Sequence, residues 1–246
     1  MTTVVVVGAT SGIGEAIGRE LASAGFDLVL AGRERTRLEA SARDLETRFG
    51  IRAGVQTFEA LEFDAHDTWT EKCARIAGVP IDGMVLCYGV MEEESVAAAD
   101  GRIARSMIDV NFSSAVCLLD RMADDLKKRG AGFLCAVTSV AGDRGRASNA
   151  HYAATKAGLS AYLSGLRGQL APVGVSVIDV RPGTIDTKLT YGRPSLFLIS
   201  TPERVAKDTL RGIRRNRAVV YTPGFWRIIM FLIRHLPDFL FRRLGV

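Results

Sequence analysis

The chain has 246 residues, 48% of them hydrophobic and 24% charged, with 25 glycines and a net charge of +5. This composition is typical of one folded α/β domain and excludes a disordered or fibrous chain. The sequence has no basic–aromatic module and no zinc-ligand spacing, so we expect it to bind neither nucleic acid nor a metal ion.

The cysteines are widely spaced and form no Cys-x-x-Cys pair: Cys73, Cys87, Cys117 and Cys135. Two of them fall in predicted strands, which indicates reduced, buried thiols and a cytoplasmic protein. Met1 leads directly into a strand pattern, so we expect no signal peptide.

The first predicted strand, Val4–Val7, is a β-branched run without alternation, as expected of a strand buried on both faces. It leads into Gly8-Ala-Thr-Ser-Gly-Ile-Gly14, and a helical pattern then runs to Ala24 and stops at Gly25. Glycines in such a turn let backbone amides approach a pyrophosphate at the helix N-terminus. The turn therefore predicts a dinucleotide site, and a tight turn without a ligand is the alternative.

The second predicted strand, Asp27–Ala31, ends in Gly-Arg33 and is followed by an amphipathic helix at 34–49. An acidic residue at this point binds the ribose 2′-hydroxyl of NAD, whereas an arginine accommodates the 2′-phosphate of NADP. Because Arg33 stands there and Arg35 is near, we expect NADP(H) to be favoured over NAD(H). The alternative is an ordinary solvated arginine.

Strands and helices continue to alternate further along the chain. A third strand is predicted around 57–63, delivering Asp64 as a candidate for the adenine amino group, and a fourth strand is predicted at 81–88. This alternation predicts parallel βαβ units and a Rossmann-type, doubly wound parallel sheet. A long helical stretch at 102–129 follows, and Asn111 interrupts its apolar face.

A buried strand predicted at 133–137 is closed by a hydroxyl residue, Ser139, and Tyr152 and Lys156 follow in an Ala-rich helical segment. Residues four apart lie on one helix face, so the phenol and the ammonium can share a pocket. A nearby cation favours the ionised phenol and so lowers its pKa toward neutral pH. General acid–base catalysis is most effective when the pKa of the catalytic group lies near the working pH. A chance pairing on the helix face is the alternative.

With Pro182-Gly183 after a strand at 175–180, these motifs in this order resemble the classical short-chain dehydrogenase/reductase family over nearly the whole chain. The resemblance implies a Rossmann-type fold that carries hydride between a nicotinamide and an alcohol or ketone. It implies that Tyr152 is the proton donor or acceptor and that Ser139 binds the substrate oxygen. It further implies that Lys156 holds the nicotinamide ribose and that Asn111 places a water in the proton relay.

The resemblance also implies a set of cofactor contacts: Gly8, Thr10, Ser11, Gly12, Ile13, Gly14, Arg33, Asp64, Gly89, Tyr152, Lys156, Pro182, Gly183, Ile185 and Thr187. The sequence departs from the family pattern at two points. Cys87-Tyr88-Gly89 replaces the usual Asn-Ala-Gly, and Val7 stands where Thr is common. The helices that hold Asn111 and Tyr152 resemble those through which family members pair, so we expect a homodimer or homotetramer.

The chain is predicted to divide into a catalytic domain, residues 1–222, with a substrate lid at about 184–200, and an amphipathic C-terminal tail, residues 223–246. Within the tail, apolar residues with Trp and Phe are edged by arginines and broken by Pro237, which fits an interfacial helix. We therefore expect a cytoplasmic protein that contacts the inner face of the membrane. A helix that covers the sheet or a subunit interface is the alternative.

The tail also looks like the ending of the decaprenylphosphoryl-2-keto-ribose reductases, in Pro223-x-x-Trp-Arg and Arg-His-Leu-Pro237. A lipid-linked keto-sugar is therefore the first substrate expected. The alternatives are another hydrophobic ketone, of steroid or 3-oxoacyl type, and a non-catalytic NADP-sensing protein. The complete catalytic set argues against a sensor.

Overall fold

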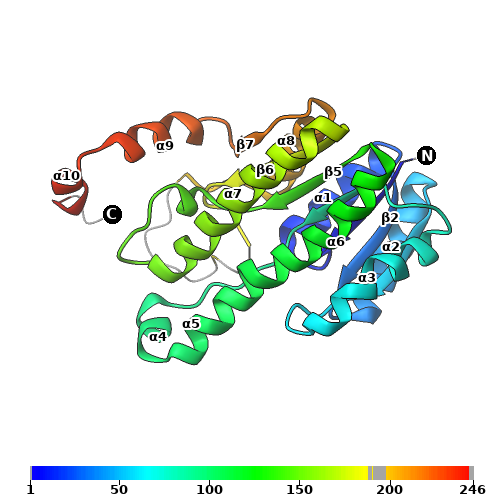
Figure 1. Cartoon of the computed structure of the whole chain (residues 1–246), viewed down its shortest axis with the longest axis horizontal. Helices are drawn as coiled ribbons and strands as arrows, with labels where there is room; N and C mark the ends of the chain where they lie inside the picture. Colours follow the sequence, from blue (N-terminus) through cyan, green and yellow to red (C-terminus); the bar gives the residue numbers. More distant parts are fainter. Residues whose placement is uncertain (1, 188–189, 191–197, 244–246) are drawn as a thin grey trace.

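The computed structural model describes residues 2–187, 190 and 198–243. Its strands form one parallel sheet in the order β3-β2-β1-β4-β5-β6-β7 (Figure 1). The strands are β1 (Thr3–Val7), β2 (Asp27–Gly32), β3 (Ala53–Thr57), β4 (Gly83–Leu86), β5 (Gly132–Val137), β6 (Val175–Pro182) and β7 (Val219–Thr222). The strand order reverses between β1 and β4, where doubly wound sheets bind their ligands. The sheet confirms the predicted Rossmann-type fold.

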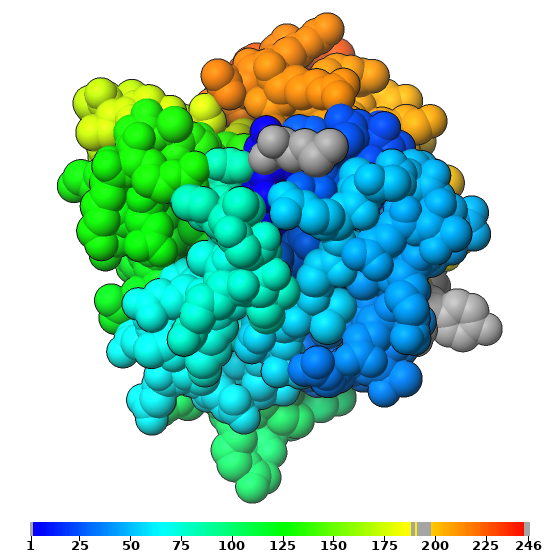
Figure 2. All heavy atoms as spheres, turned by 90° about the vertical axis from the view of Figure 1, so that its right-hand side faces the viewer, coloured from blue at the N-terminus to red at the C-terminus, as the bar shows by residue number. Residues whose placement is uncertain are grey.

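Helices cover both faces of the sheet and enclose two apolar cores. On one face lie α1 (Gly12–Ser23), α2 (Arg35–Phe49) and α8 (Pro202–Arg214), and on the other lie α3 (Phe63–Ala77), α6 (Ser114–Arg129) and α7 (Ala150–Leu170). Figure 2 shows the end of the molecule where the chain begins, with both helical layers closing around the start of β1. The functional cavity described below lies at the opposite, carboxyl end of the strands.

The expected long helix at 102–129 is present and contains a π-helical turn in its middle. It consists of α5 (Gly101–Ile108), a π-helical turn at Asp109–Ser113 and α6. A short helix, α4 (Glu94–Ala99), precedes it. Single π-helical turns occur frequently at functional sites, and this one contains Asn111.

The predicted third strand at 57–63 is wrong, because β3 ends at Thr57 and α3 begins at Phe63. The apolar residues of that stretch do not all lie in the core, as a buried strand would require, because Leu61 is exposed. Burial instead follows the helical period at His66, Trp69, Thr70 and Cys73. Asp64 consequently lies exposed in the first turn of α3.

The tail forms α9 (Trp226–His235) and α10 (Asp238–Arg243), with Pro237 between them as expected. Figure 1 shows both helices reaching away from β7 rather than lying over a face of the sheet. One side packs inward through three buried residues, Trp226, Met230 and Phe241. The other side leaves large apolar side chains exposed: Ile228, Phe231, Leu232, Phe239 and Leu240. Among the described helices, none is long and apolar enough to cross a bilayer.

Candidate active site

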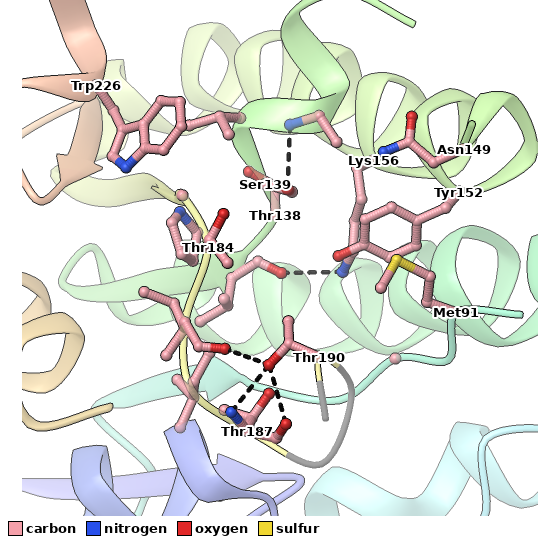
Figure 3. Close-up of a pocket in the computed structure, with 18 of the residues that line it drawn as sticks. Met91, Thr138, Ser139, Asn149, Tyr152, Lys156, Thr184, Thr187, Thr190 and Trp226 are labelled. Atoms are coloured by element: carbon pink, nitrogen blue, oxygen red, sulfur yellow. Dashed lines mark hydrogen bonds between the residues drawn. The ribbon is translucent and has the colours of Figure 1, made fainter. Parts of the chain in front are cut away.

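A cavity of about 490 Å³ opens at the carboxyl ends of β4, β5 and β6. Three of the four predicted catalytic residues line it, namely Ser139, Tyr152 and Lys156. Figure 3 shows Ser139 and Tyr152 facing the same space, with Lys156 running beside the tyrosine ring. Other parts of its wall are Ile13, Cys87, Tyr88, Gly89, Met91, Glu93, Arg146, Asn149, Pro182, Gly183, Thr184, Ile185, Thr187 and Trp226.

Lys156 is only 4% exposed, and its Nζ donates a hydrogen bond of 3.1 Å to the carbonyl of Val137. The same nitrogen lies 5.8 Å from the centre of the Tyr152 ring. Burial lowers the pKa of Lys156 to about 8, because it penalises the charged form, while Asp179 opposes the shift. The pair is therefore a phenol beside a cation that can change charge near neutral pH.

Ser139 follows β5 and begins a 3-10 turn at Val140–Asp143, where its Oγ accepts a hydrogen bond of 3.1 Å from the Ala141 amide. This turn packs directly against the backbone of α7. A Cβ on Gly142 would lie 2.8 Å from the carbonyl carbon of Lys156, so only glycine allows the approach. The close contact fixes Ser139 relative to the helix that holds Tyr152.

A buried polar network behind Ser139 was not predicted from the sequence. Thr138 donates to Asp179, and Arg181 bridges Asp179 to Asp143 at 2.7 and 2.6 Å. The signal for it was present, since Asp179 interrupts the apolar run of a buried strand. The network holds the ends of β5 and β6 together at the cavity wall.

Asn111 is buried, and its side chain is used to hold the segment after β4. Its Oδ1 accepts from the Val90 amide at 2.7 Å, and its Nδ2 donates to the Val90 carbonyl at 2.8 Å and to Thr155 at 3.2 Å. A Cβ on Gly89 would lie 3.0 Å from Asn111 Oδ1 and 3.4 Å from Lys156 Nζ. Asn111, Gly89 and Lys156 therefore meet, although Asn111 does not line the cavity. Its role in a water relay stays a prediction.

The unusual Cys87-Tyr88-Gly89 segment has its own contacts. The Tyr88 hydroxyl bonds Ser114 Oγ at 2.9 Å, and its ring packs 5.3 Å from that of Phe58. Burial raises the pKa of the Cys87 thiol to about 12 and raises the pKa of Tyr88 as well. The cysteines are all free thiols, and Cys117 differs from the other three in being exposed.

The glycine turn is tied to this segment. Ser11 caps α1 by accepting from the Gly14 amide at 3.0 Å, and its hydroxyl donates to the carbonyls of Gly8 and Cys87 at 2.7 and 3.2 Å. Gly8 has a φ of +82°, and a Cβ there would lie 2.9 Å from the Cys87 carbonyl carbon. The start of α1 is thereby held beside the cavity, with Ile13 in its wall.

These residues fit a nicotinamide dinucleotide. The N-terminus of a twelve-residue helix, α1, is available for a pyrophosphate. Thr187 lies next to it, with Cγ2 3.4 Å from the position of a Cβ on Gly12. Pro182, Gly183, Ile185 and Thr187 all line the cavity. The predicted lid at 184–200 lies largely outside the described residues, since 188–189 and 191–197 are not described.

Arg33 and Asp64 separate in the structure. Arg33 follows β2 and lines a second cavity of about 320 Å³ with Thr57, Phe58 and Lys72, whereas Asp64 lines neither cavity. Two carboxylates, Glu59 and Glu62, also border this space. The arginines nearby are engaged, Arg35 by Glu39 and Arg37 by Glu15 and Glu34, while Arg33 makes no ion pair with any described residue.

The contribution of the tail to the cavity was also not predicted. Trp226 is buried and lines the wall beside Gly183, and a methyl group at Gly183 would overlap its ring. The base of α9 packs on Val140, next to Ser139. No local sequence pattern reports a contact of this kind.

Comparison with known proteins agrees with the fold. The chain matches the family model of short chain dehydrogenases over residues 2–195. An uncharacterized oxidoreductase of Mycobacterium tuberculosis is 34% identical over 98% of this chain and 96% of its own length. An uncharacterized oxidoreductase of Streptomyces coelicolor is also 34% identical, over 99% of this chain and 96% of its own length.

Solved structures show the same fold. A short-chain dehydrogenase from Sphingobium yanoikuyae in complex with NADPH has a TM-score of 0.82 at 22% identity, covering 97% of both chains. An alcohol dehydrogenase from the archaeon Thermococcus sibiricus, complexed with 5-hydroxy-NADP, has a TM-score of 0.77 at 25% identity, covering 90% of this chain and 94% of that one. The chain belongs to the short-chain dehydrogenase/reductase family and is an oxidoreductase of that family.

Proposed function

We propose that this chain is an NADP(H)-dependent reductase that converts a ketone to an alcohol. The observation that carries the proposal is the convergence of Ser139, Tyr152 and Lys156 on one cavity beside the start of α1. Ser139 Oγ binds the substrate oxygen, and the Tyr152 hydroxyl delivers its proton to that oxygen. Lys156, held by Val137, stabilises the phenolate that remains.

A nicotinamide dinucleotide bound by these residues supplies the hydride. Gly8–Gly14 and Thr187 would hold its pyrophosphate side, and Lys156 would hold the ribose. NADP(H) is favoured over NAD(H) because Arg33 stands after β2 without an ion-pair partner among the described residues. Solved relatives of the same fold were crystallised with NADPH or an NADP derivative, which supports the same choice.

The tail is evidence for a hydrophobic, lipid-linked substrate, and a polyprenyl-linked keto-sugar is the first candidate. Ile228 is 67% exposed, Phe231 61% and Leu232 62%, on the same short helix whose Trp226 lines the cavity. Exposed apolar patches of this kind mark a partner or a membrane. Arg227, Arg234, Arg242 and Arg243 flank the patch, and each contributes about 1 kcal/mol near an anionic leaflet. The tail would thus attach the protein to the inner membrane face and bring the cavity to its substrate.

Two alternatives follow from the same site. Another hydrophobic ketone, of steroid or 3-oxoacyl type, would use the same residues, and an NADP-sensing protein would bind cofactor without turnover.

We further propose a homodimer or homotetramer formed through α6 and α7, the helices that resemble the pairing helices of the family. Light scattering at micromolar concentration tests the assembly, and a monomer would contradict it.

The test of the reductase is the consumption of NADPH over a panel of ketones, measured for the wild type and for Tyr152→Phe. Loss of the general acid should lower turnover roughly 10²- to 10⁴-fold while NADPH still binds. Tyr162→Phe is the matched control, because Tyr162 lies on the same helix and bonds Asp120 outside the cavity. Near-normal turnover in Tyr152→Phe would reject the assignment, and NADPH binding without turnover of any ketone would favour the sensor.

A further inference from the structure

Two polar side chains in the cavity wall have no role in the proposed reduction. Arg146 and Asn149 lie between the 3-10 turn after Ser139 and the start of α7, and both line the cavity. Arg146 Nε and Asn149 Oδ1 are buried and have no hydrogen-bond partner within the described part of the chain. An unmatched buried polar atom costs free energy, so a native structure normally supplies a partner.

Two other arginines near the cavity, in contrast, have hydrogen-bond or ion-pair partners. Arg144 donates to the carbonyls of Ile233 and Leu236 and stacks 3.9 Å from the centre of the Phe241 ring. Arg181 forms ion pairs with Asp143 and Asp179. Arg146, two residues from Arg144, forms no ion pair with a described residue, and burial lowers its pKa because nothing offsets the loss of water. It still carries its charge at neutral pH.

Asn149 is unusual for its position. It stands at the N-cap of α7, where an asparagine side chain normally accepts a hydrogen bond from the first turn, but this one makes no such bond. Figure 3 shows it beside Tyr152. Its free Oδ1 is an acceptor suited to a hydroxyl group, whereas Arg146 is a donor suited to an anionic oxygen.

The phosphates of the cofactor do not account for these groups. They are expected at the start of α1, where Gly12 neighbours Thr187. In Figure 3, Thr187 lies at the bottom of the labelled residues, while Asn149 lies at the upper right, beyond Tyr152. Glu93 also lines the cavity, but it is exposed and does not raise the pKa of Arg146.

We infer that Arg146 and Asn149 form a substrate subsite that binds an anionic oxygen, phosphoryl or carboxylate, together with a hydroxyl group near the reacting ketone. The inference rests on the proposed reductase function and narrows its substrate. A phosphoryl-linked keto-sugar provides both groups, whereas a neutral steroid ketone provides no anion. Arg146 is a specificity residue in this account and takes no part in the proton transfer.

The test compares paired ketones in wild type and Arg146→Gln. The pairs are 4-acetylphenyl phosphate against 4-methoxyacetophenone, and 4-acetylbenzoate against its methyl ester, so that phosphoryl and carboxylate are separated. We expect the ratio of kcat/KM for the anionic to the neutral ketone to fall roughly 10- to 100-fold, the loss of one charge-assisted hydrogen bond. Arg217→Gln, an exposed arginine outside both cavities, removes the same charge and should leave the ratio unchanged.

A binding measurement keeps the subsite testable even if no ketone is reduced. Calorimetry with 4-acetylphenyl phosphate on NADPH-saturated Tyr152→Phe should show binding that Arg146→Gln, added to it, weakens by a similar factor. An unchanged ratio and unchanged binding would overturn the subsite and leave the reductase standing. Binding that depends on Arg146, without turnover in the wild type, would support the subsite and reject the reductase.

Discussion

The two halves of the cavity are built in different ways. The cofactor half, made by the β1–α1 turn, Gly89 and α7, is fixed by backbone approaches so close that a Cβ would not fit. The substrate half, made by Arg146, Asn149 and the tail, is fixed by a few side-chain anchors and leaves polar and apolar groups without partners among the described residues. The cofactor half therefore depends on the backbone of the fold, whereas the substrate half depends on individual side chains.

Trp226 packs the tail against the cavity wall beside Gly183, and its loss should have the largest effect. Trp226→Ala should lower the free energy of unfolding by about 3–5 kcal/mol, the usual cost of removing a buried aromatic side chain. Denaturant unfolding measures it. A loss below about 1 kcal/mol would show that the tail is an independent appendage.

A double-mutant cycle sharpens this result. Gly183→Ala should be strongly destabilising alone, because its methyl group overlaps the Trp226 ring, and much less so in the Trp226→Ala background. If the changes in unfolding free energy of the two single variants simply add in the double variant, the two residues are not in contact.

The burial of Lys156 should make the free energy of unfolding depend on pH. Its pKa falls from 10.5 to about 8 on folding, so between those values the unfolded chain binds more protons and stability rises with pH. The cost of burying the ammonium is fully present below about pH 8 and gone above 10.5, a change of about 3 kcal/mol.

Lys156→Met removes the titrating group, so its unfolding free energy should lack this rise when both proteins are compared by urea unfolding without cofactor. The exposed Lys207→Met is the control and should keep the wild-type profile. Parallel pH profiles for wild type and Lys156→Met would show that the lysine is not buried as described.

The exposed face of the tail should matter only for membranes. Replacing Phe231 and Leu232 with Ser removes two side chains that are 61% and 62% exposed, so the fold should lose little stability. Sedimentation with anionic vesicles should show roughly 10- to 100-fold weaker binding, because each apolar side chain contributes up to about 1.5–3 kcal/mol when it enters an apolar phase.

Added salt should weaken the vesicle binding of the wild type further, since the arginines act by charge. Leu61→Ser removes an exposed leucine elsewhere on the surface and should leave vesicle binding intact. Equal binding of wild type and the tail variant would assign the apolar face to another partner.

The smallest effect is expected at the second cavity. Arg33→Ala should weaken NADPH binding roughly 10-fold and leave NADH binding nearly unchanged, because one charge-assisted contact to the 2′-phosphate is lost. Calorimetry on the Tyr152→Phe protein measures both cofactors without turnover. Arg35→Ala is the matched control, since Arg35 pairs with Glu39. Equal losses for NADPH and NADH would reject the role of Arg33.

The sequence allowed the prediction of the cofactor half because its signals are local. The glycine turn, the Tyr152–Lys156 spacing and the β-branched strands are short patterns, and most of the elements lie within a few residues of their predicted positions. The bounds of the third strand are wrong because the sequence alone does not show which residues of the apolar stretch after Thr57 are buried. Asp64, expected at the end of that strand, lies in the first turn of α3, and its contact with adenine stays a prediction.

The substrate half could not be predicted in the same way. Arg146 and Asn149 matter through burial and missing partners, which only the folded chain reveals. Trp226 reaches Gly183 through tertiary packing, and no spacing between the two encodes it. The apolar face of the tail was visible in the sequence, but its division into a buried and an exposed side was not.

The most direct test of the account is the initial rate of NADPH oxidation with a polyprenyl-phosphoryl keto-sugar carried in anionic vesicles. Wild type should reduce it, Tyr152→Phe should not, and the Phe231→Ser, Leu232→Ser variant should be slowed on vesicles but far less on a short soluble ketone. If wild type consumes no NADPH with this substrate, or if the tail variant is slowed equally on both ketones, the proposed link between the tail and a lipid-borne ketone is contradicted.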